Sequence, residues 1–189
     1  MSEFYGEPEL NGKVLPDVTF KTRVRTNEDS ENPFTWKDMT TQDYFSGKKC
    51  VLFALPGAFT PTCSASHLPG YEEMYDKFKD IGIDEVYCLS VNDSFVMNAW
   101  AQNQKLENVK VIPDGNGEFT DAMDMLVEKR DRCFGMRSWR YAMIVNNSVI
   151  EEMFVEPGKD DNVEEDPYGE SSPENVLKYL QTKLDKSTN

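Results

Sequence analysis

A run of six apolar residues, 50–55, constrains the fold more than any other segment, because Pro56 and Gly57 follow it at once. A short, continuous apolar run is typical of a strand buried on both faces of a sheet, and Pro-Gly ends it. Thr60-Pro61 then has the features of a helix start, with a capping hydroxyl and proline at the first helical position. The chain passes from a buried strand into a helix within a few residues, which predicts an α/β fold.

The remaining elements complete such a fold. Period-two alternation predicts a strand at 18–26, which 34–38 continues as an N-terminal hairpin. Asn146-Asn147 predicts a tight turn, since asparagine tolerates positive φ, and Pro69 is expected to kink its helix. Strands are further expected at 85–91, 108–112, 139–145 and 149–155, and helices at 40–47, 64–82, 95–106, 118–127 and from Pro173. This order is that of the thioredoxin-like fold, a mixed central sheet with helices on both faces.

The length of 189 residues fits a single domain, 1–189. With 20 Lys and Arg against 34 Asp and Glu, the net charge of −14 disfavours binding to nucleic acid or to anionic membrane surfaces. The first residues lack a basic segment followed by an apolar run, and no stretch has the length of a membrane span, so we expect a cytoplasmic protein. The acidic run 156–170 is interpreted as a solvated loop without chemistry.

Cys63 is the candidate reactive residue, because it falls in the first turn of the helix expected from Thr60-Pro61. Such a junction between a strand and a helix is where α/β sheets place ligands. Unpaired backbone N–H groups and the positive end of the helix dipole favour a thiolate there. A free cysteine is often merely a small buried residue, so the position, and not the residue type, supports a nucleophile.

His67, the single histidine, follows Cys63 by four residues and can share its helix face. The pair is compatible with nucleophile activation or with metal binding. No spacing among the other cysteines and carboxylates supplies further ligands, so we expect no metal site. We favour a histidine that packs or hydrogen-bonds near the site over a general base.

Four arginines lie within 130–141, just before an expected strand. Arginine stays charged and offers several fixed donors, which suits it to holding a thiolate and an oxyanion leaving group. Arg140 adjoins the apolar strand and is therefore best placed to reach the active end of the sheet.

The segment PGAFTPTCS, residues 56–64, contains the P-x-x-x-T-x-x-C pattern and resembles the peroxiredoxins. Followed by HLPGY, it is similar to the peroxiredoxin 5, or type II, subfamily. Later blocks of that subfamily are matched in order by YCLSVNDSFVMNAW from 87, DGNGEF from 114 and MRSWRY from 136. The resemblance implies a thiol peroxidase acting on hydrogen peroxide and organic hydroperoxides, without cofactor.

Carried over position by position, the resemblance implies that Cys63 attacks the peroxide and becomes a sulfenic acid. Thr60 and Arg140 would position the thiolate and the peroxide oxygens, and Pro56 would shield the pocket from water. The family also tends to form homodimers through the face near the active site.

The sequence leaves open which thiol reduces the oxidised Cys63. Cys88 matches a cysteine of many type II members, although a buried strand residue is the favoured interpretation, and Cys133 is either a resolving thiol or a bystander. Cys50 is expected in the core. The block from 136 to 180 resembles bacterial members with a fused glutaredoxin domain, and the given chain stops where that domain would begin. The resemblance thus implies reduction by glutathione with a separate glutaredoxin, or by thioredoxin.

Two other function classes use the same residues. A redox sensor or binding protein of the thioredoxin fold would signal through oxidised Cys63 without rapid turnover. A disulfide oxidoreductase is disfavoured, because such enzymes use vicinal cysteines and this chain has none.

Overall fold

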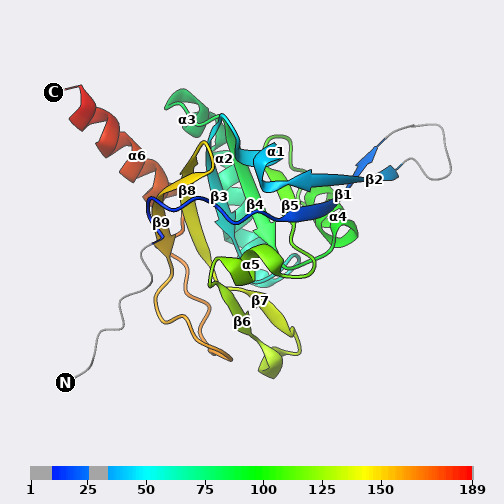
Figure 1. Ribbon diagram of the computed structural model, residues 1–189. Coiled ribbons are helices and arrows are strands. Elements are labelled where there is room, and N and C mark those ends of the chain that lie inside the picture. Colours follow the sequence, from blue (N-terminus) through cyan, green and yellow to red (C-terminus); the bar gives the residue numbers. More distant parts are fainter. Residues whose placement is uncertain (1–9, 26–33, 189) are drawn as a thin grey trace, which may run out of the picture.

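A computed structural model describes residues 10–25 and 34–188. Its centre is a five-stranded sheet in the order β5-β4-β3-β8-β9 (Figure 1). β3 pairs in parallel with β4 and antiparallel with β8, so the sheet is mixed, as predicted. The strands of this sheet are β3 (Lys49–Ala54), β4 (Glu85–Ser90), β5 (Lys110–Pro113), β8 (Tyr141–Asn146) and β9 (Val149–Val155).

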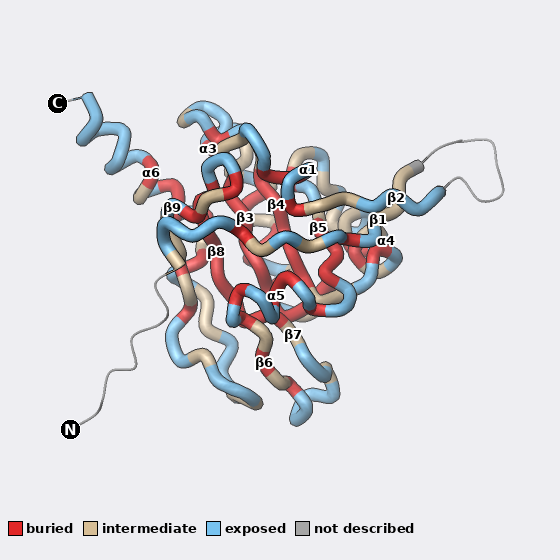
Figure 2. Tube along the Cα trace, in the orientation of Figure 1, coloured by how far each residue is buried: buried red, intermediate tan, exposed pale blue. Residues whose placement is uncertain are grey.

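Helices cover both faces of the sheet, and alternate residues of β3 serve the two sides. Val51 and Phe53 belong to one apolar cluster, and Leu52 and Ala54 to the other. The first cluster includes residues of α2 (Leu68–Glu73), α3 (Tyr75–Asp80), α4 (Ser94–Asn103) and α6 (Pro173–Ser187), and the second includes residues of α1 (Thr41–Phe45) and α5 (Glu118–Ala122). Figure 2 shows the central strands as the buried part of the chain, which confirms the two-sided burial expected of the run 50–55.

The N-terminal hairpin is confirmed: β1 (Thr19–Arg25) pairs antiparallel with β2 (Phe34–Thr40). Phe20 anchors it, because its ring is 2% exposed and lies 5.8 Å from the ring of Phe119 in α5.

One expected helix and one expected turn differ from the prediction in their bounds. The helix expected over 118–127 ends at Ala122, because Asp124 adopts a left-handed φ of 56° and the chain turns into β6 (Leu126–Glu128), which pairs with β7 (Met136–Ser138). The turn between β8 and β9 is formed by Asn147 and Ser148, one residue later than predicted, with φ of 47° and 65°. Positive φ at both central residues suits the tight hairpin turns that match strand twist.

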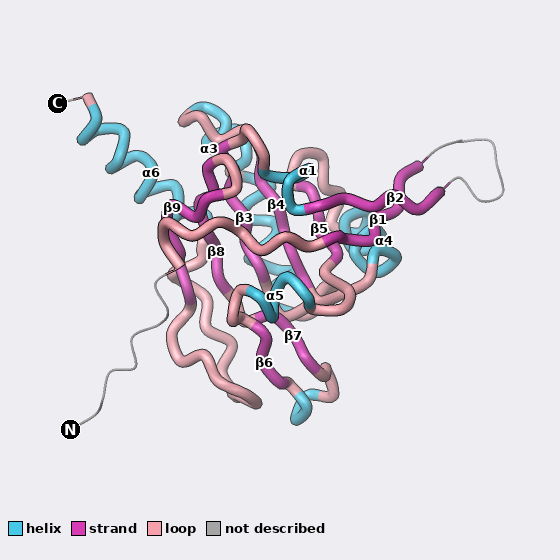
Figure 3. Tube along the Cα trace, in the orientation of Figure 1, coloured by secondary structure: helices cyan, strands magenta, loops and turns pink. Residues whose placement is uncertain are grey.

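The helix that carries Cys63 begins where predicted but is not regular. Ser64 N–H donates to Thr60 O at 3.0 Å, and Pro61 is the first helical residue. Residues Cys63–His67 form a π-helix in which Leu68 N–H donates to Cys63 O. The next residue is Pro69, which has no N–H to continue the ladder. Instead of a simple kink, the structure has this wider turn, then α2, an interruption at Met74, and α3. Figure 3 shows α3 as a short helix.

The last helix is confirmed, with Ser172 Oγ accepting from Asn175 N–H and Pro173 in its first turn. The preceding acidic segment, 156–170, contains no helix or strand and is called the acidic loop below. None of the helices in the described part of the chain combines the length and the apolar character needed to cross a bilayer.

Candidate active site

The loop between β3 and the π-helix is tied to the end of β4. Ala58 N–H donates to Asn92 Oδ1 at 3.0 Å, and Ser90 Oγ donates to the same oxygen at 2.6 Å. Leu55 N–H reaches Leu89 O at 3.3 Å. These bonds hold the segment before Cys63 at the carboxyl ends of two parallel strands, the edge at which α/β sheets place their ligands.

Arg140 and Cys63 meet at this edge, 77 residues apart in sequence. Arg140 Nη1 lies 3.6 Å from Cys63 Sγ, and both residues are only 1% exposed. The second nitrogen of the same guanidinium, Nη2, donates to Asp166 Oδ1 at 2.7 Å. A cation fixed beside sulfur and shielded from water stabilises an anion on that sulfur more strongly than an exposed one does.

The π-helix turns His67 toward the same guanidinium. Arg140 Nη1 lies 3.0 Å from His67 Nδ1, and His67 Nε2 lies 3.2 Å from the carbonyl oxygen of Ser171. Because a guanidinium only donates and a carbonyl only accepts, Nδ1 is the acceptor and Nε2 carries the proton. Burial, and then the charge of Arg140, lower the pKa of His67 well below its usual value. A neutral ring with both nitrogens engaged agrees with the packing interpretation and leaves no lone pair for a metal.

This histidine predicts a pH dependence of stability. The unfolded chain takes up a proton on histidine near pH 6.5, whereas the folded chain does not. The contribution of neutral His67 to the free energy of unfolding should therefore be fully present above about pH 6.5. As the pH falls below that value, the free energy of unfolding should decrease by up to about 1.4 kcal/mol per pH unit. Urea unfolding of wild type and of His67→Gln between pH 5 and 8 measures this slope. Equal slopes in the two proteins would contradict it.

The acidic loop is not the featureless solvated segment that its composition predicts. Glu156 is 1% exposed, and its Oε1 accepts from Ser171 N and Ser171 Oγ at 2.8 and 2.7 Å. This carboxylate closes the loop onto the start of α6. Tyr168 then lies against the site, with its ring centre 5.0 Å from that of His67 and 5.8 Å from Arg140 Cζ. Together with Asp166, these residues make the loop a wall of the site, which corrects the earlier interpretation.

Asp166 is expected to fix the position of the Arg140 guanidinium group. Burial raises the pKa of the Asp166 carboxyl, but the charge and hydrogen bond of Arg140 lower it further, so the net pKa lies below the usual aspartate value. Its side chain is 40% exposed, so the pair contributes on the order of 1 kcal/mol. Asp166→Asn should slow oxidation of Cys63 by about fivefold, measured by rapid mixing with hydrogen peroxide. Glu165→Gln, a neighbouring acidic residue of the loop, is the matched control, and an equal effect in both would refute the positioning role.

A second arginine lies across the loop before Cys63. Arg137 Nη1 donates to the carbonyl oxygen of Pro56 at 3.3 Å, and Arg137 Nε donates to Phe134 O at 3.0 Å. A Cβ added to Gly57 would lie 2.6 Å from this Nη1. Only glycine therefore lets the guanidinium pass so close to the backbone.

Thr60 and Pro56 belong to the loop before Cys63, and their expected roles stay predictions. Thr60 Oγ1 donates to Gly57 O at 2.6 Å, so its hydroxyl stabilises the loop. The sequence had instead predicted that this hydroxyl caps the helix. The oxygen keeps lone pairs for a further donor.

The other cysteines occupy different environments, and all four are free thiols. Cys88 is fully buried in β4, and burial, then the nearby Cys63, raise the pKa of its thiol well above the usual value. Cys50 is also buried, which raises its pKa to about 12 and agrees with a core residue. Cys133 is exposed, at a left-handed φ of 57°. No contact between it and Cys63 is present among the described residues.

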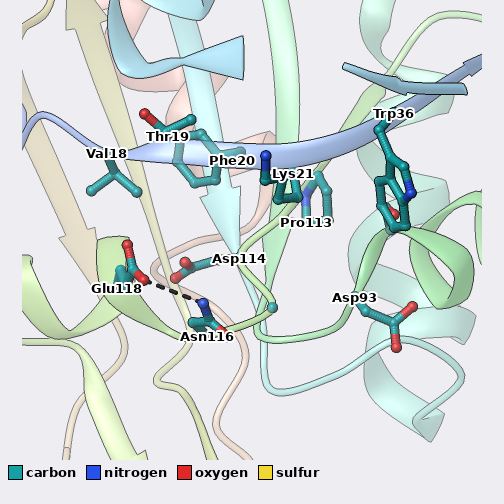
Figure 4. Close-up of a pocket in the computed structure, with 12 residues that line it drawn as sticks. Val18, Thr19, Phe20, Lys21, Trp36, Asp93, Pro113, Asp114, Asn116 and Glu118 are labelled. Atoms are coloured by element: carbon teal, nitrogen blue, oxygen red, sulfur yellow. Dashed lines mark hydrogen bonds between the residues drawn. The ribbon is translucent and has the colours of Figure 1, made fainter. Parts of the chain in front are cut away.

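Within residues 10–25 and 34–188, no three histidine, cysteine or acidic side chains converge as a metal site. A separate pocket of about 230 Å³ lies between β1 and the turn after β5, lined by residues that include Trp36, Asp93 and Asp114 (Figure 4). There Asn116 Nδ2 donates to Glu118 Oε1 at 3.2 Å. None of the predicted site residues lines this pocket, so the chemistry is to be sought at Cys63.

The sequence reasoning missed Asp166 and Tyr168. The sequence offered no signal for them, because the register that pairs Tyr141 with Val155 depends on a turn one residue later than predicted and on an irregularity in the pairing at Ile144 and Val145. This register puts the first residue of the acidic loop beside Arg140, and Glu156 N–H indeed donates to Arg140 O at 3.1 Å.

Comparisons with known proteins find relatives of this chain. A family model described as Redoxin matches residues 11–170. The chain is 59% identical over 170 residues to a "Peroxiredoxin" of Rhizobium etli, covering 89% of this chain and 95% of that one. It is 51% identical to the "Hybrid peroxiredoxin hyPrx5" of Haemophilus influenzae, covering 90% of this chain and 66% of that one. The solved structure of reduced Prx3 from Vibrio vulnificus in complex with hydrogen peroxide has 36% identity and a TM-score of 0.76, covering 90% of this chain and 98% of that one.

Proposed function

Because the chain belongs to the peroxiredoxin family, whose relatives are thiol-dependent peroxidases, we propose that Cys63 is the thiol that reduces the peroxide. The observation that carries this proposal is the approach of Arg140 Nη1 to Cys63 Sγ, at 3.6 Å and shielded from water. Among the four cysteines, Cys63 alone has a guanidinium nitrogen as a hydrogen-bond partner within the described part of the chain.

The reaction is a displacement at oxygen. The Cys63 thiolate forms an S–O bond with one peroxide oxygen while the O–O bond breaks. The departing oxygen leaves with the electron pair and takes up a proton, which gives water from hydrogen peroxide or an alcohol from an organic hydroperoxide. Sulfur is oxidised by two electrons to the sulfenic acid, and the peroxide is reduced by two. Excess peroxide would oxidise the sulfenic acid further.

Arg140 is proposed to stabilise both ends of this step. Its charge holds the thiolate, and its Nε–H, which has no hydrogen-bond partner among the described residues, can donate to the departing oxygen, on which negative charge develops. Thr60 is proposed to contact the peroxide through its hydroxyl, and Pro56 to limit entry of water. The Vibrio vulnificus protein is named as a complex with hydrogen peroxide, which supports that molecule as a substrate here.

Glutathione with glutaredoxin is the proposed reductant, with thioredoxin as the alternative. The thiol of Cys88 is deeply buried and its pKa is raised, so it is a poor attacking group. An external thiol is therefore favoured: it forms a mixed disulfide with Cys63 and releases water, and a second thiol then restores the Cys63 thiol. Cys133 is exposed and is the remaining intramolecular candidate.

We further propose that residues 1–189 act as one domain and that two copies associate through the face near the active site. Phe59 supports such a contact, since it lies in the loop before Cys63 and is 53% exposed. Assignment to the type II subfamily is supported by the motif around Cys63 and by the similarity to the hybrid peroxiredoxin.

Steady-state peroxide consumption tests the proposed function. Turnover is expected with glutathione plus glutaredoxin. The same assay is repeated with thioredoxin and its reductase as the reductant. Mass spectrometry of the oxidised protein then shows whether Cys63 carries glutathione or a disulfide to Cys88 or Cys133. A single stoichiometric burst with every reductant would identify a redox sensor and overturn the peroxidase.

A further inference from the structure

Lys129 is a buried residue whose ammonium makes no direct polar contact with the described part of the chain. Its residue is 5% exposed, and in the described part of the chain its ammonium has no hydrogen bond or ion pair. Nζ lies instead 5.6 Å from the centre of the Trp139 ring. Burial of a charge is costly unless the charge is paired, and a cation over a ring recovers only part of that cost.

The charges that act on Lys129 come from the site and its wall. Burial lowers the pKa of the Lys129 ammonium. The groups that then act on it electrostatically are Asp166, Arg132, Arg140 and Cys63. Lys129 therefore lies within electrostatic reach of the sulfur that is oxidised.

Lys129 also opens into a pocket of about 440 Å³, which we call the Lys129 pocket. Its lining consists of Lys129, Asp131, Arg132, Asn162, Val163 and Glu164. Lys129 is the one buried member of this set, while Asp131, Arg132 and Glu164 are exposed. The charges of Lys129 and Arg132 balance those of Asp131 and Glu164, and Lys129 is the one charged member of the lining whose residue is buried.

Two segments build the Lys129 pocket, and both also reach the active site. The chain after β6 supplies one wall, and the acidic loop supplies the other. Glu128 N–H donates to Asp161 Oδ1 at 2.7 Å, and Asp131 N–H donates to Asn162 Oδ1 at 3.1 Å. Trp139, under the ammonium, donates through Nε1 to Glu156 O at 2.7 Å and immediately precedes Arg140. Figure 1 shows the loop before α6 beside the β6–β7 hairpin.

We propose that the Lys129 pocket binds a carboxylate of the small thiol that reduces oxidised Cys63. A carboxylate supplies the acceptors and the negative charge that Lys129 lacks, and such charge-assisted bonds are among the stronger ones in proteins. Glutathione carries two carboxylates, so it fits this chemistry, whereas 2-mercaptoethanol carries none. The inference rests on the proposed function and adds to it a residue that selects the reductant.

A single-turnover experiment separates this role from the peroxide step. Wild-type protein is oxidised with one equivalent of hydrogen peroxide and mixed with glutathione, glutathione diethyl ester or 2-mercaptoethanol, without glutaredoxin. Loss of the sulfenic acid is followed by mass spectrometry of quenched samples. At a net charge of −14, non-specific electrostatics favour the ester, so faster reaction with glutathione requires a local cation.

We expect wild type to react about tenfold faster with glutathione than with its diethyl ester, and Lys129→Gln to lose this ratio while its rate with 2-mercaptoethanol is unchanged. Lys129→Arg should retain most of the ratio. Arg130→Gln is the matched control, since it removes the adjacent exposed cation, which pairs with Glu128 and does not line the pocket.

Three outcomes would overturn the inference. One is wild type that does not distinguish glutathione from its ester, a result that also decides the matter if Lys129→Gln does not fold. Another is an unchanged ratio in Lys129→Gln. The third is an equal loss with all three thiols and with peroxide, which would assign Lys129 to the Cys63 environment. Failure of the proposed function is distinct, because no sulfenic acid would then form.

Discussion

Replacement of Cys63 by serine is expected to reduce peroxide turnover to the uncatalysed background. A serine hydroxyl is not ionised near neutral pH and has no stable state equivalent to the sulfenic acid, so neither half of the cycle can proceed. The measurement is peroxide loss with saturating glutathione and glutaredoxin. Serine is close to cysteine in size, and Cys63→Ser should unfold near the wild-type midpoint.

The other cysteines provide matched controls for this prediction. Cys133→Ser removes an exposed thiol, and Cys88→Ser removes a buried one in the neighbouring strand. Turnover with glutathione should persist in both variants. Appreciable turnover in Cys63→Ser would move the reactive centre elsewhere, and loss of turnover in Cys133→Ser alone would identify that thiol as the resolving group.

Replacement of Arg140 by alanine is expected to slow oxidation of Cys63 by about 10² to 10³, the usual effect of removing one fixed donor from a developing oxyanion. The guanidinium contacts Cys63, His67 and Asp166 at once. Lysine keeps the charge but has no planar fork, so Arg140→Lys should be intermediate. Rapid mixing with hydrogen peroxide measures the step directly and is independent of the reductant.

Folding must be measured alongside, since alanine leaves Asp166 without its partner and opens space beside a buried histidine. Arg130→Ala serves as the control, because Arg130 is an exposed arginine that pairs with Glu128. A near-normal rate in Arg140→Ala, together with a slow Arg137→Ala, would transfer the role to Arg137, which already reaches Pro56 O.

Much of the fold follows from local patterns. The apolar run at 50–55 could only be satisfied inside a sheet, and the structure buries Val51 and Leu52 on opposite faces of β3. Pro61 begins the helix as expected, so Cys63 falls in its first turn. The helix expected over 118–127 was wrong in its second half, because Leu126 and Val127 pair with β7 and such non-local pairing overrides helix propensity.

The sequence by itself determined that Cys63 lies in the first turn of a helix, because Pro61, the residue at which that helix begins, is its near neighbour in the chain. Only the tertiary structure decided what surrounds its sulfur. Asp166 reaches Arg140 from 26 residues away, and Ser171 sets the tautomer of His67 from 104 residues away. Contacts of this kind depend on strand register and loop closure, which bring a segment of apparently solvated acidic residues against a buried guanidinium. Composition describes such a segment correctly as charged, but it carries no information on which of its charges will be paired.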